Sequence, residues 1–289
     1  MQTCNHLPDL RKAVERLRAA GPVAMVPTMG ALHEGHLTLV REARKRAPAV
    51  VVSIFVNPRQ FGPQEDLSSY PRQLAEDSRQ LTREGVDVLW APGVEDMYPQ
   101  GFATALSVTG VSDGLCGAAR PGHFDGVATV VAKLFNQVQP DCALFGEKDW
   151  QQLAVIRRMA TDLDLTFPAV ERIHGVPTVR EDDGLALSSR NRYLSVDDRQ
   201  RAATLPRAMR AAIAAIEAGQ PAAGAVQGVH DSLLRGGFAS VDYVELVDAV
   251  SLAPVVTAQA MPARLLVAAR IGGTRLIDNM PVDASRLIY

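Results

Sequence analysis

The sequence predicts an α/β protein with a Rossmann-like parallel sheet in its N-terminal part and a smaller α+β domain in its C-terminal part. Short apolar runs alternate with amphipathic helical stretches through the first part of the chain. One run, residues 49–56, is β-branched and apolar almost throughout, which is typical of strands covered on both faces. After about residue 184 the pattern changes to helices followed by strands. These observations indicate two domains of different class.

In the N-terminal part, helices are expected where apolar residues recur every three or four positions, and strands where short apolar runs end at turn residues. Strands that alternate with helices form parallel sheets with right-handed crossovers. The expected order is helix 9–20, strand 23–26, helix 34–47, strand 49–56, helix 72–84, strand 86–92, helix 126–140, strand 141–146 and helix 149–163.

In the C-terminal part, two Ala-rich helices are expected over residues 197–219 and 222–237. Strands are expected over 240–249 and 263–282, the latter folded at a Gly-Gly turn. A boundary near Asp183 divides the chain into a Rossmann-like domain, 1–183, and an α+β domain, 184–289, that is expected to act as a lid.

The composition excludes several classes of protein. A formal net charge of −2 over 289 residues gives no basic excess for binding nucleic acid. Three widely spaced cysteines without a CxxC pair argue against a disulfide framework and favour the reducing cytoplasm. The N-terminus is too polar for a signal peptide, and no apolar run is long enough to span a bilayer. A cytoplasmic protein without a membrane partner is therefore expected.

The segment TMGALHEGH, residues 28–36, sits at an expected strand-to-helix turn. If the helix starts at Glu34, its unpaired N–H groups and positive dipole end favour phosphate, with His33 and His36 on one face. Gly35 would let a nucleotide approach the helix backbone. Two alternatives stay open: a zinc site, which would need a third protein ligand, and two ordinary surface histidines.

Three further motifs carry groups suited to the same ligand. Lys148 follows the strand 141–146, and the loop with Ser188, Ser189 and Arg190 combines hydroxyl donors with a guanidinium that grips phosphate. Asn57 and Gln60 follow the strand 49–56 and suit a small polar substrate. Each motif also has an ordinary interpretation. Lys148 could form a solvated ion pair with Asp149, the Ser-Ser-Arg loop could cap the next helix, and Asn57 and Gln60 could belong to an ordinary turn.

The positions of these motifs favour one site. Three of the motif turns directly follow expected parallel strands, and ligands of open α/β sheets bind beyond the carboxyl ends of the strands. The chain has no GxxxxGK[ST] or GxGxxG motif and no Ser-His-Asp elbow. A nucleotide would therefore be held by the helix tip, Lys148 and the Ser-Ser-Arg loop.

The motifs PTMGALHEGH, IFVNPRQF, GHFDGVATVV, FGEKDWQQL and VPTVREDDGLALSSRNRYLS, in this order, resemble those of the pantoate–β-alanine ligase (pantothenate synthetase) family, over residues 5–285. That family belongs to the nucleotidylyltransferase superfamily, whose HxGH motif is similar to the HIGH signature of class I aminoacyl-tRNA synthetases. The resemblance implies ATP and Mg²⁺, formation of a pantoyl adenylate from (R)-pantoate bound in the domain 1–183, attack by β-alanine, and a homodimer.

The resemblance also implies roles for individual residues. His36 would be the proton donor, with His33 and Lys148 as further catalytic residues. Gln60 would bind both pantoate and β-alanine, with Asn57 nearby and Gln152 on pantoate, and Asp77 would be a carboxylate near Mg²⁺. Arg59 stands where many relatives carry Met. The ATP contacts would come from Met29, Gly30, Ala31, Leu32, His33, Glu34, Gly35, His36, Gly146, Glu147, Lys148, Asp149, Val179, Leu187, Ser188, Ser189 and Arg190.

The chemistry of the first step refines the role of the histidines. Pantoate attacks through a carboxylate that is already ionised at neutral pH, so this step needs no general base. His33 and His36 are therefore expected to bind the phosphates and stabilise the charge of the departing pyrophosphate. Competing hypotheses are another nucleotidylyltransferase, a non-catalytic nucleotide-binding module, and a zinc hydrolase built on the two histidines.

Overall fold

The computed structural model describes residues 1–63, 65–255 and 262–283, and the chain forms two compact units. The first unit consists of Met1–Thr109, Arg120–Glu147 and Val155–Pro177, and the second of Gly110–Ala119, Lys148–Ala154 and Thr178–Tyr289. The sequence placed one boundary near Asp183. The second unit takes in two earlier segments as well, because Leu115 and Trp150 pack with apolar residues of the C-terminal sheet.

The first unit is built on a six-stranded, fully parallel sheet. Its order is β1-β4-β3-β2-β5-β6, which confirms the Rossmann-like expectation. The two short edge strands were not predicted. The strands are β1 (Gln2–Cys4), β2 (Val23–Thr28), β3 (Ala49–Ile54), β4 (Val88–Trp90), β5 (Cys142–Gly146) and β6 (Ile173–Val176).

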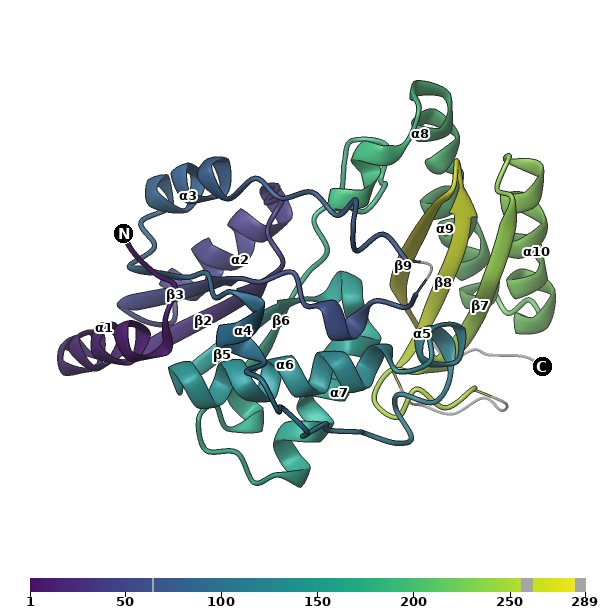
Figure 1. Cartoon of the computed structure of the whole chain (residues 1–289). Helices are drawn as coiled ribbons and strands as arrows, with labels where there is room; N and C mark the ends of the chain where they lie inside the picture. The colour runs from purple at the N-terminus through teal and green to yellow at the C-terminus, as the bar shows by residue number, and fades with distance from the viewer. Residues whose placement is uncertain (64, 256–261, 284–289) are drawn as a thin grey trace. The chain divides into compact units, whose positions relative to one another are not determined.

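Helices cover both faces of this sheet, as Figure 1 shows: α2 and α3 lie on one side of the strands and α1 and α6 on the other. The α2 and α3 side encloses a cluster that includes Val26, Val52 and Leu81, all almost fully buried. Each such side chain contributes about 1.5–3 kcal/mol by leaving water. The helices are α1 (Leu7–Ala20), α2 (Glu34–Arg44), α3 (Leu74–Arg83), α4 (Val94–Met97), α6 (His123–Val138) and α7 (Trp150–Asp162).

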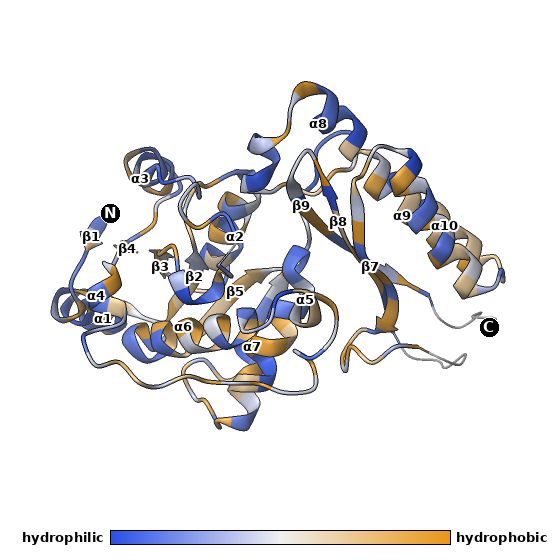
Figure 2. Cartoon of the chain, turned by 45° about the vertical axis from the view of Figure 1, so that its right-hand side comes forward, coloured by the Kyte–Doolittle hydropathy of each residue, from blue (hydrophilic) through white to orange (hydrophobic). Residues whose placement is uncertain are grey.

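The second unit contains a three-stranded antiparallel sheet in the order β7-β8-β9, with α8, α9, α10 and the short α5. Figure 2 shows hydrophobic colour along much of β8 and mixed colours on α9 and α10, as expected for amphipathic helices beside a buried strand. The elements are α5 (Leu115–Ala119), α8 (Val196–Ala202), α9 (Thr204–Glu217), α10 (Ala222–Arg235), β7 (Ser240–Asp248), β8 (Ala263–Ile271) and β9 (Thr274–Val282).

Two local features of the second unit have clear causes. The predicted Gly-Gly turn joins β8 to β9, and Gly272 (φ 54°) and Gly273 (φ 76°) both adopt the left-handed conformation that a tight hairpin requires. The single helix predicted over 197–219 is instead two helices. Pro206 explains the break, because its ring would clash with the carbonyl of Ala202, the last residue of α8.

In the described ranges of the chain, no helix is long and apolar enough to cross a membrane. The three cysteines, Cys4, Cys116 and Cys142, are all free and buried.

Candidate active site

The strand order of the first unit has a switch point between β2 and β5. From β2 the chain proceeds outward through β3 and β4, and it later returns to place β5 on the other side of β2. Ligands of such sheets bind beyond the carboxyl ends of the strands at this point. The turns at Met29–Gly30, Asn57–Gln60 and Glu147 follow β2, β3 and β5, three neighbouring strands. This confirms that the motif turns share one edge of the sheet.

The turn after β2 is left-handed at two consecutive residues, Gly30 (φ 83°) and Ala31 (φ 52°). Asp77 of α3 stabilises it: its Oδ2 accepts the N–H of Ala31 and its Oδ1 that of Leu32, both at 2.9 Å. Asp77 is 1% exposed, so these charge-assisted hydrogen bonds are shielded from water. A carboxylate buried in α3 thus determines how the chain enters α2.

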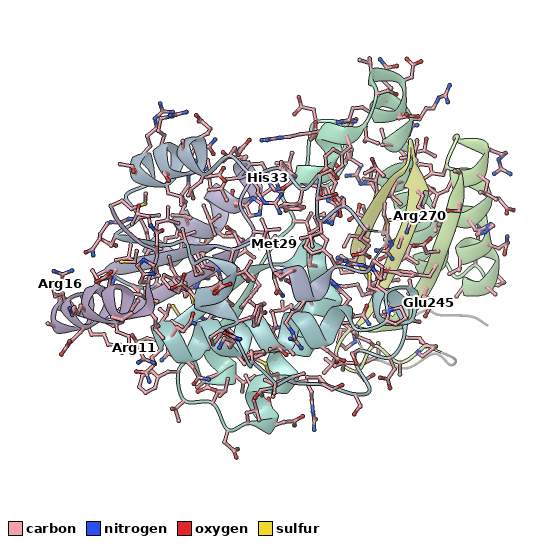
Figure 3. The ribbon with its side chains drawn as sticks, viewed as in Figure 1. Arg11, Arg16, Met29, His33, Glu245 and Arg270 are labelled. Carbon is pink, nitrogen blue, oxygen red and sulfur yellow. The ribbon has the colours of Figure 1, made fainter. Side chains whose placement is uncertain are left out.

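Helix α2 begins at Glu34, as predicted, with His33 as its N-cap. The Nδ1 atom of His33 accepts the N–H of Gly35 at 3.2 Å, and Nδ1 of His36 accepts the N–H of His33 at 3.3 Å. The two ring centroids are 4.1 Å apart. Met29 and His33 are labelled in Figure 3, on the chain between β2 and α2. An Nδ1 that accepts a hydrogen bond carries no proton, so each neutral ring has its proton on Nε2.

This tautomer suits both histidines as hydrogen-bond donors to an anion. A zinc ligand or a general base would instead use an unprotonated Nε2. Glu34 is exposed and forms an ion pair with Arg41 further along the helix. The site residues of this turn therefore divide into a buried frame, Gly30 to Leu32, and two donor rings at the helix start.

A short 3₁₀ segment after β3, Pro58–Gln60, begins after its N-cap Asn57 and ends at Gln60. Asn57 is 1% exposed and uses its full hydrogen-bonding capacity within the protein: Nδ2 donates to Gln60 Oε1 and Gly126 O, and Oδ1 accepts from Tyr98 and Arg59. Burial raises the pKa of Tyr98 to about 12, so its phenol stays protonated and donates. Asn57 thus orients the neighbouring Gln60 amide.

Gln60 retains capacity for a ligand. Its Nε2 donates to the sulfur of Met29 at 3.2 Å and its Oε1 accepts from Asn57, which among the described contacts leaves one N–H and one lone pair. That combination can both donate to a carboxylate or hydroxyl and accept from a hydroxyl or ammonium group. Gln60 also brings the second turn into contact with Met29 of the first.

Three residues that the sequence did not single out support the backbone of Gln60. His123 Nδ1 donates to the Gln60 carbonyl at 2.8 Å, and Arg120 donates to the same oxygen at 3.3 Å. Arg120 also makes a bidentate ion pair with Glu65, at 2.6 and 2.7 Å. Burial alone would raise the pKa of Glu65, but the hydrogen bonds and charge of Arg120 outweigh it and lower the pKa to about 2.

In the second unit, Lys148 belongs to a 3₁₀ turn, Glu147–Asp149, that leads into α7. Its ammonium group lies 3.9 Å from the carboxylate of Asp149, and its side chain is 19% exposed. Gln152 lies in the first turn of α7 and is half-buried. Its neighbour Gln151 is buried, accepts the N–H of Cys116 and donates to the carbonyls of Val111 and Gly114.

The structure brings Val179 and Leu187 together, because the N–H of Leu187 donates to the Val179 carbonyl beside an isolated bridge between Arg180 and Ala186. Ser188 follows this hairpin and caps a 3₁₀ helix, Ser189–Tyr193, by accepting the N–H of Arg190 at 3.3 Å. The capping alternative for this loop is therefore also present. The cap uses only a lone pair of the Ser188 oxygen, so the hydroxyl group can still donate its proton to a ligand.

The described contacts of Asp77 give it a structural role, and its assignment as a residue near Mg²⁺ stays a prediction. Its two oxygens accept from Ala31, Leu32 and the side chain of Gln73, which is the pattern of a turn anchor. Among residues 1–63, 65–255 and 262–283 there is no group of three or more His, Cys, Asp or Glu side chains placed to hold a metal ion.

Comparison with known proteins identifies the family. The Pantoate-beta-alanine ligase family model matches residues 2–281. A pantothenate synthetase from Novosphingobium aromaticivorans is 67% identical over 98% of this chain and 99% of its own length, and one from Rhizorhabdus wittichii is 59% identical over 98% and 99%.

Two solved structures give the same result. A pantothenate synthetase from Thermus thermophilus superimposes with a TM-score of 0.91 at 49% identity, covering 98% of this chain and 99% of that one. The pantoate-β-alanine ligase from Francisella tularensis, solved in complex with β-γ ATP and β-alanine, gives 0.82 at 32% identity over 97% of each chain. The chain belongs to the pantoate–β-alanine ligase family.

Proposed function

We propose that His33, His36, Lys148 and the Ser188–Arg190 loop bind the phosphates of ATP in this ligase. The enzyme condenses pantoate with β-alanine through a pantoyl adenylate, releasing pyrophosphate and AMP. The observation that carries the proposal is the acceptor role of both histidine Nδ1 atoms, because it directs the ring protons to Nε2 as donors. The remaining predicted ATP contacts, Gly146, Glu147, Asp149, Val179 and Leu187, are proposed as part of the same set.

In the first step, a pantoate carboxylate oxygen attacks the α-phosphorus of ATP, and the bond to the β,γ-pyrophosphate breaks. The electron pair leaves with pyrophosphate, so negative charge grows on its bridging oxygen. Donors placed at developing charge are the largest single source of rate enhancement in many enzymes. We assign this role to His33, His36 and Lys148. No proton needs to be removed from the nucleophile.

In the second step, the neutral amine of β-alanine attacks the pantoyl carbonyl carbon, the carbon–oxygen bond to AMP breaks, and the nitrogen loses one proton. We propose that Gln60 contacts both pantoate and β-alanine, since its amide keeps one donor and one acceptor. Gln152 is proposed as a second pantoate contact. Asn57 acts through Gln60, because its own hydrogen-bonding groups are all engaged.

We propose that Mg²⁺ would arrive as the ATP complex, held mainly by phosphate oxygens, because both oxygens of Asp77 already accept backbone N–H groups of the turn before α2. A cytoplasmic homodimer is also proposed, on the family resemblance alone. Light scattering on the purified chain tests the dimer, because a mass of one chain, 31.1 kDa, would contradict it.

The reaction is tested by omitting components one at a time. AMP formation should require ATP, pantoate, β-alanine and Mg²⁺ together. ATP–pyrophosphate exchange should require pantoate but not β-alanine, because the adenylate forms first. Exchange without pantoate, or AMP release that does not depend on β-alanine, would contradict the two-step reaction.

A further inference from the structure

Strand β9 carries two adjacent buried polar residues, Asp278 (2% exposed) and Asn279 (4% exposed). Burying a carboxylate and an amide side by side is unfavourable unless both are hydrogen-bonded. Each of the two is bonded to a different segment of the second unit. Both segments lead directly to residues proposed above to bind the phosphates of ATP.

Asp278 holds the hairpin that precedes the Ser-Ser-Arg loop. Arg180 makes a bidentate ion pair with it, Nη1 to Oδ2 at 2.7 Å and Nη2 to Oδ1 at 2.9 Å, and the Asp278 side chain is 0% exposed. The same guanidinium donates to the carbonyl of Gly184 at 3.0 Å, on the other side of the hairpin. A planar, bidentate pair fixes orientation as well as distance, so the hairpin has one position on β9.

Asn279 holds the Lys148 turn. Its Nδ2 donates to the carbonyl of Lys148 at 2.8 Å, and its Oδ1 accepts from Arg264 of β8. The Arg264 guanidinium lies over the indole ring of Trp150, 3.5 Å from its centroid, and the indole N–H donates to Ala249 at 2.9 Å. The turn that carries Lys148 is therefore attached to the sheet at its carbonyl and at the residue two positions later.

The two attachments are coupled through neighbouring residues of one strand. The backbone N–H of Asn279 donates to Asp278 Oδ1 at 2.7 Å, and Arg180 also reaches the Asn279 carbonyl at 3.4 Å. Side chains of successive residues on a strand point to opposite faces, so one strand can hold two segments at once. Strand β9 is hydrogen-bonded to β8 from Thr274 to Val282, so it provides a fixed support for both segments.

We propose that Asp278 and Asn279 are positioning residues that set the spacing between Lys148 and the Ser188–Arg190 loop for one triphosphate. The inference rests on the phosphate-binding roles proposed for those residues. Neither side chain is a catalytic group, since each acts through a segment that it holds. A displacement of about 1 Å at a catalytic group can cost up to about a hundredfold in rate.

The test is Asn279→Asp, which keeps the shape and the acceptor for Arg264 but places an oxygen where the Lys148 carbonyl needs a donor. The KM for ATP is expected to rise about tenfold while the KM values for pantoate and β-alanine stay within about twofold. The matched control is Asp242→Asn in the same sheet, because the described ion pairs of Asp242 are with Arg275, at 2.7 Å, and Arg270, and with neither of the two segments. It should leave all three KM values unchanged.

Arg180→Lys gives an independent second variant, since it retains the charge but not the bidentate geometry with Asp278. It is expected to raise the KM for ATP by a similar factor. If either variant lowers the unfolding temperature and leaves the KM for ATP unchanged, the residues are merely structural and the inference is overturned.

Lys148→Ala separates this inference from the proposed function. Near-normal exchange activity in Lys148→Ala would refute the phosphate role itself. A strong loss in Lys148→Ala together with a normal Asn279→Asp would refute only the positioning role. In the double variant, the losses in kcat/KM for ATP should be less than additive, because Asn279 acts through Lys148; additive losses would contradict this.

Discussion

The carboxylate of Asp77 accepts the backbone N–H of Leu32 at 2.9 Å and lies buried against the turn that precedes His33 and His36, the two histidines proposed to bind phosphate. The same carboxylate accepts from Ala31, which is left-handed, and a methyl group at Gly30 would lie only 3.1 Å from it. The chain therefore enters α2 along one path, with Asp77 on α3 as its anchor. The angle at which His33 and His36 face a ligand depends on this buried acceptor.

Asp77→Asn should slow adenylate formation without changing the Mg²⁺ concentration that gives half the maximal rate. An amide has only one oxygen, so one of the two backbone N–H groups would face an N–H donor. We expect the free energy of unfolding to fall by about 1–3 kcal/mol and the exchange rate to fall at least about tenfold. Urea unfolding and ATP–pyrophosphate exchange at several Mg²⁺ concentrations measure these effects.

The control is Glu76→Gln, one residue earlier on α3, which removes an exposed ion pair with Arg79 and should be nearly neutral. If Asp77→Asn instead needed much more Mg²⁺ for half-maximal rate and kept its stability, Asp77 would be a metal residue after all.

The histidine geometry predicts an order of activity among substitutions at His36. Gln can place an N–H near the position of Nε2, whereas Asn reaches only to the position of Nδ1. His36→Gln should therefore retain about ten times more exchange activity than His36→Asn, and His36→Ala should lose about a hundredfold or more. His230→Ala, a half-exposed histidine on α10, should behave as the unaltered enzyme. Equal losses in the Gln and Asn variants would show that a donated hydrogen bond is not the function.

Local sequence pattern predicted the parts of the site that depend on neighbours in the chain. The start of α2 at Glu34 followed from a strand, a glycine turn and a helical pattern within a few residues of each other. The edge strands β1 and β6 were missed because three or four residues carry too little periodicity, and their pairing depends on partners far along the chain.

The supporting residues of the site could not be predicted for the same physical reason. Asp77 is 46 positions from Ala31, and Asn279 is 131 positions from Lys148. The sequence alone does not distinguish an Asp or Asn that is buried from one on the surface. Only the fold shows which backbone group such a residue hydrogen-bonds. The sequence therefore suggested only a metal-related role for Asp77, and its contacts with the turn at Ala31 and Leu32 became visible in the fold.

Gly126 of α6 predicts a steric test of the Gln60 segment. A Cβ added at this glycine would lie 2.3 Å from the carbonyl oxygen of Arg59 and 2.7 Å from the backbone nitrogen of Gln60. Gly126→Ala must therefore displace the segment, and the KM values for pantoate and β-alanine should rise about tenfold or more, with a smaller change for ATP.

Gly228→Ala on α10 is the matched control, because its added methyl group would have no described atom within 4 Å beyond its chain neighbours and the nearby backbone of α10. Alanine is favoured over glycine in helices by up to about 1 kcal/mol, so this variant should be active and slightly more stable. Unchanged KM values in Gly126→Ala would mean that the position of Gln60 does not govern substrate use.

The ion pair between Glu65 and Arg120 predicts a specific pH dependence of stability. The pKa of Glu65 lies at about 2 in the folded chain, below its ordinary value of 4.5. The unfolded chain therefore takes up this proton first as the pH falls, and the stabilisation is complete above about pH 5 and disappears as the pH approaches 2.

Glu65→Gln isolates this contribution, because it removes the titrating group and keeps the size of the side chain. The difference in free energy of unfolding between the unaltered chain and the variant should be constant from pH 8 to about pH 5, and should shrink steadily below that. Urea unfolding followed by tryptophan fluorescence at half-unit pH steps measures the curve. The pair between Glu42 and the exposed ammonium group of Lys45 provides a comparison, and Glu42→Gln should change stability less than Glu65→Gln does. A Glu65→Gln difference that does not vary with pH would show that the side chain contributes by packing, since only an ionised carboxylate loses its partner when it takes up a proton.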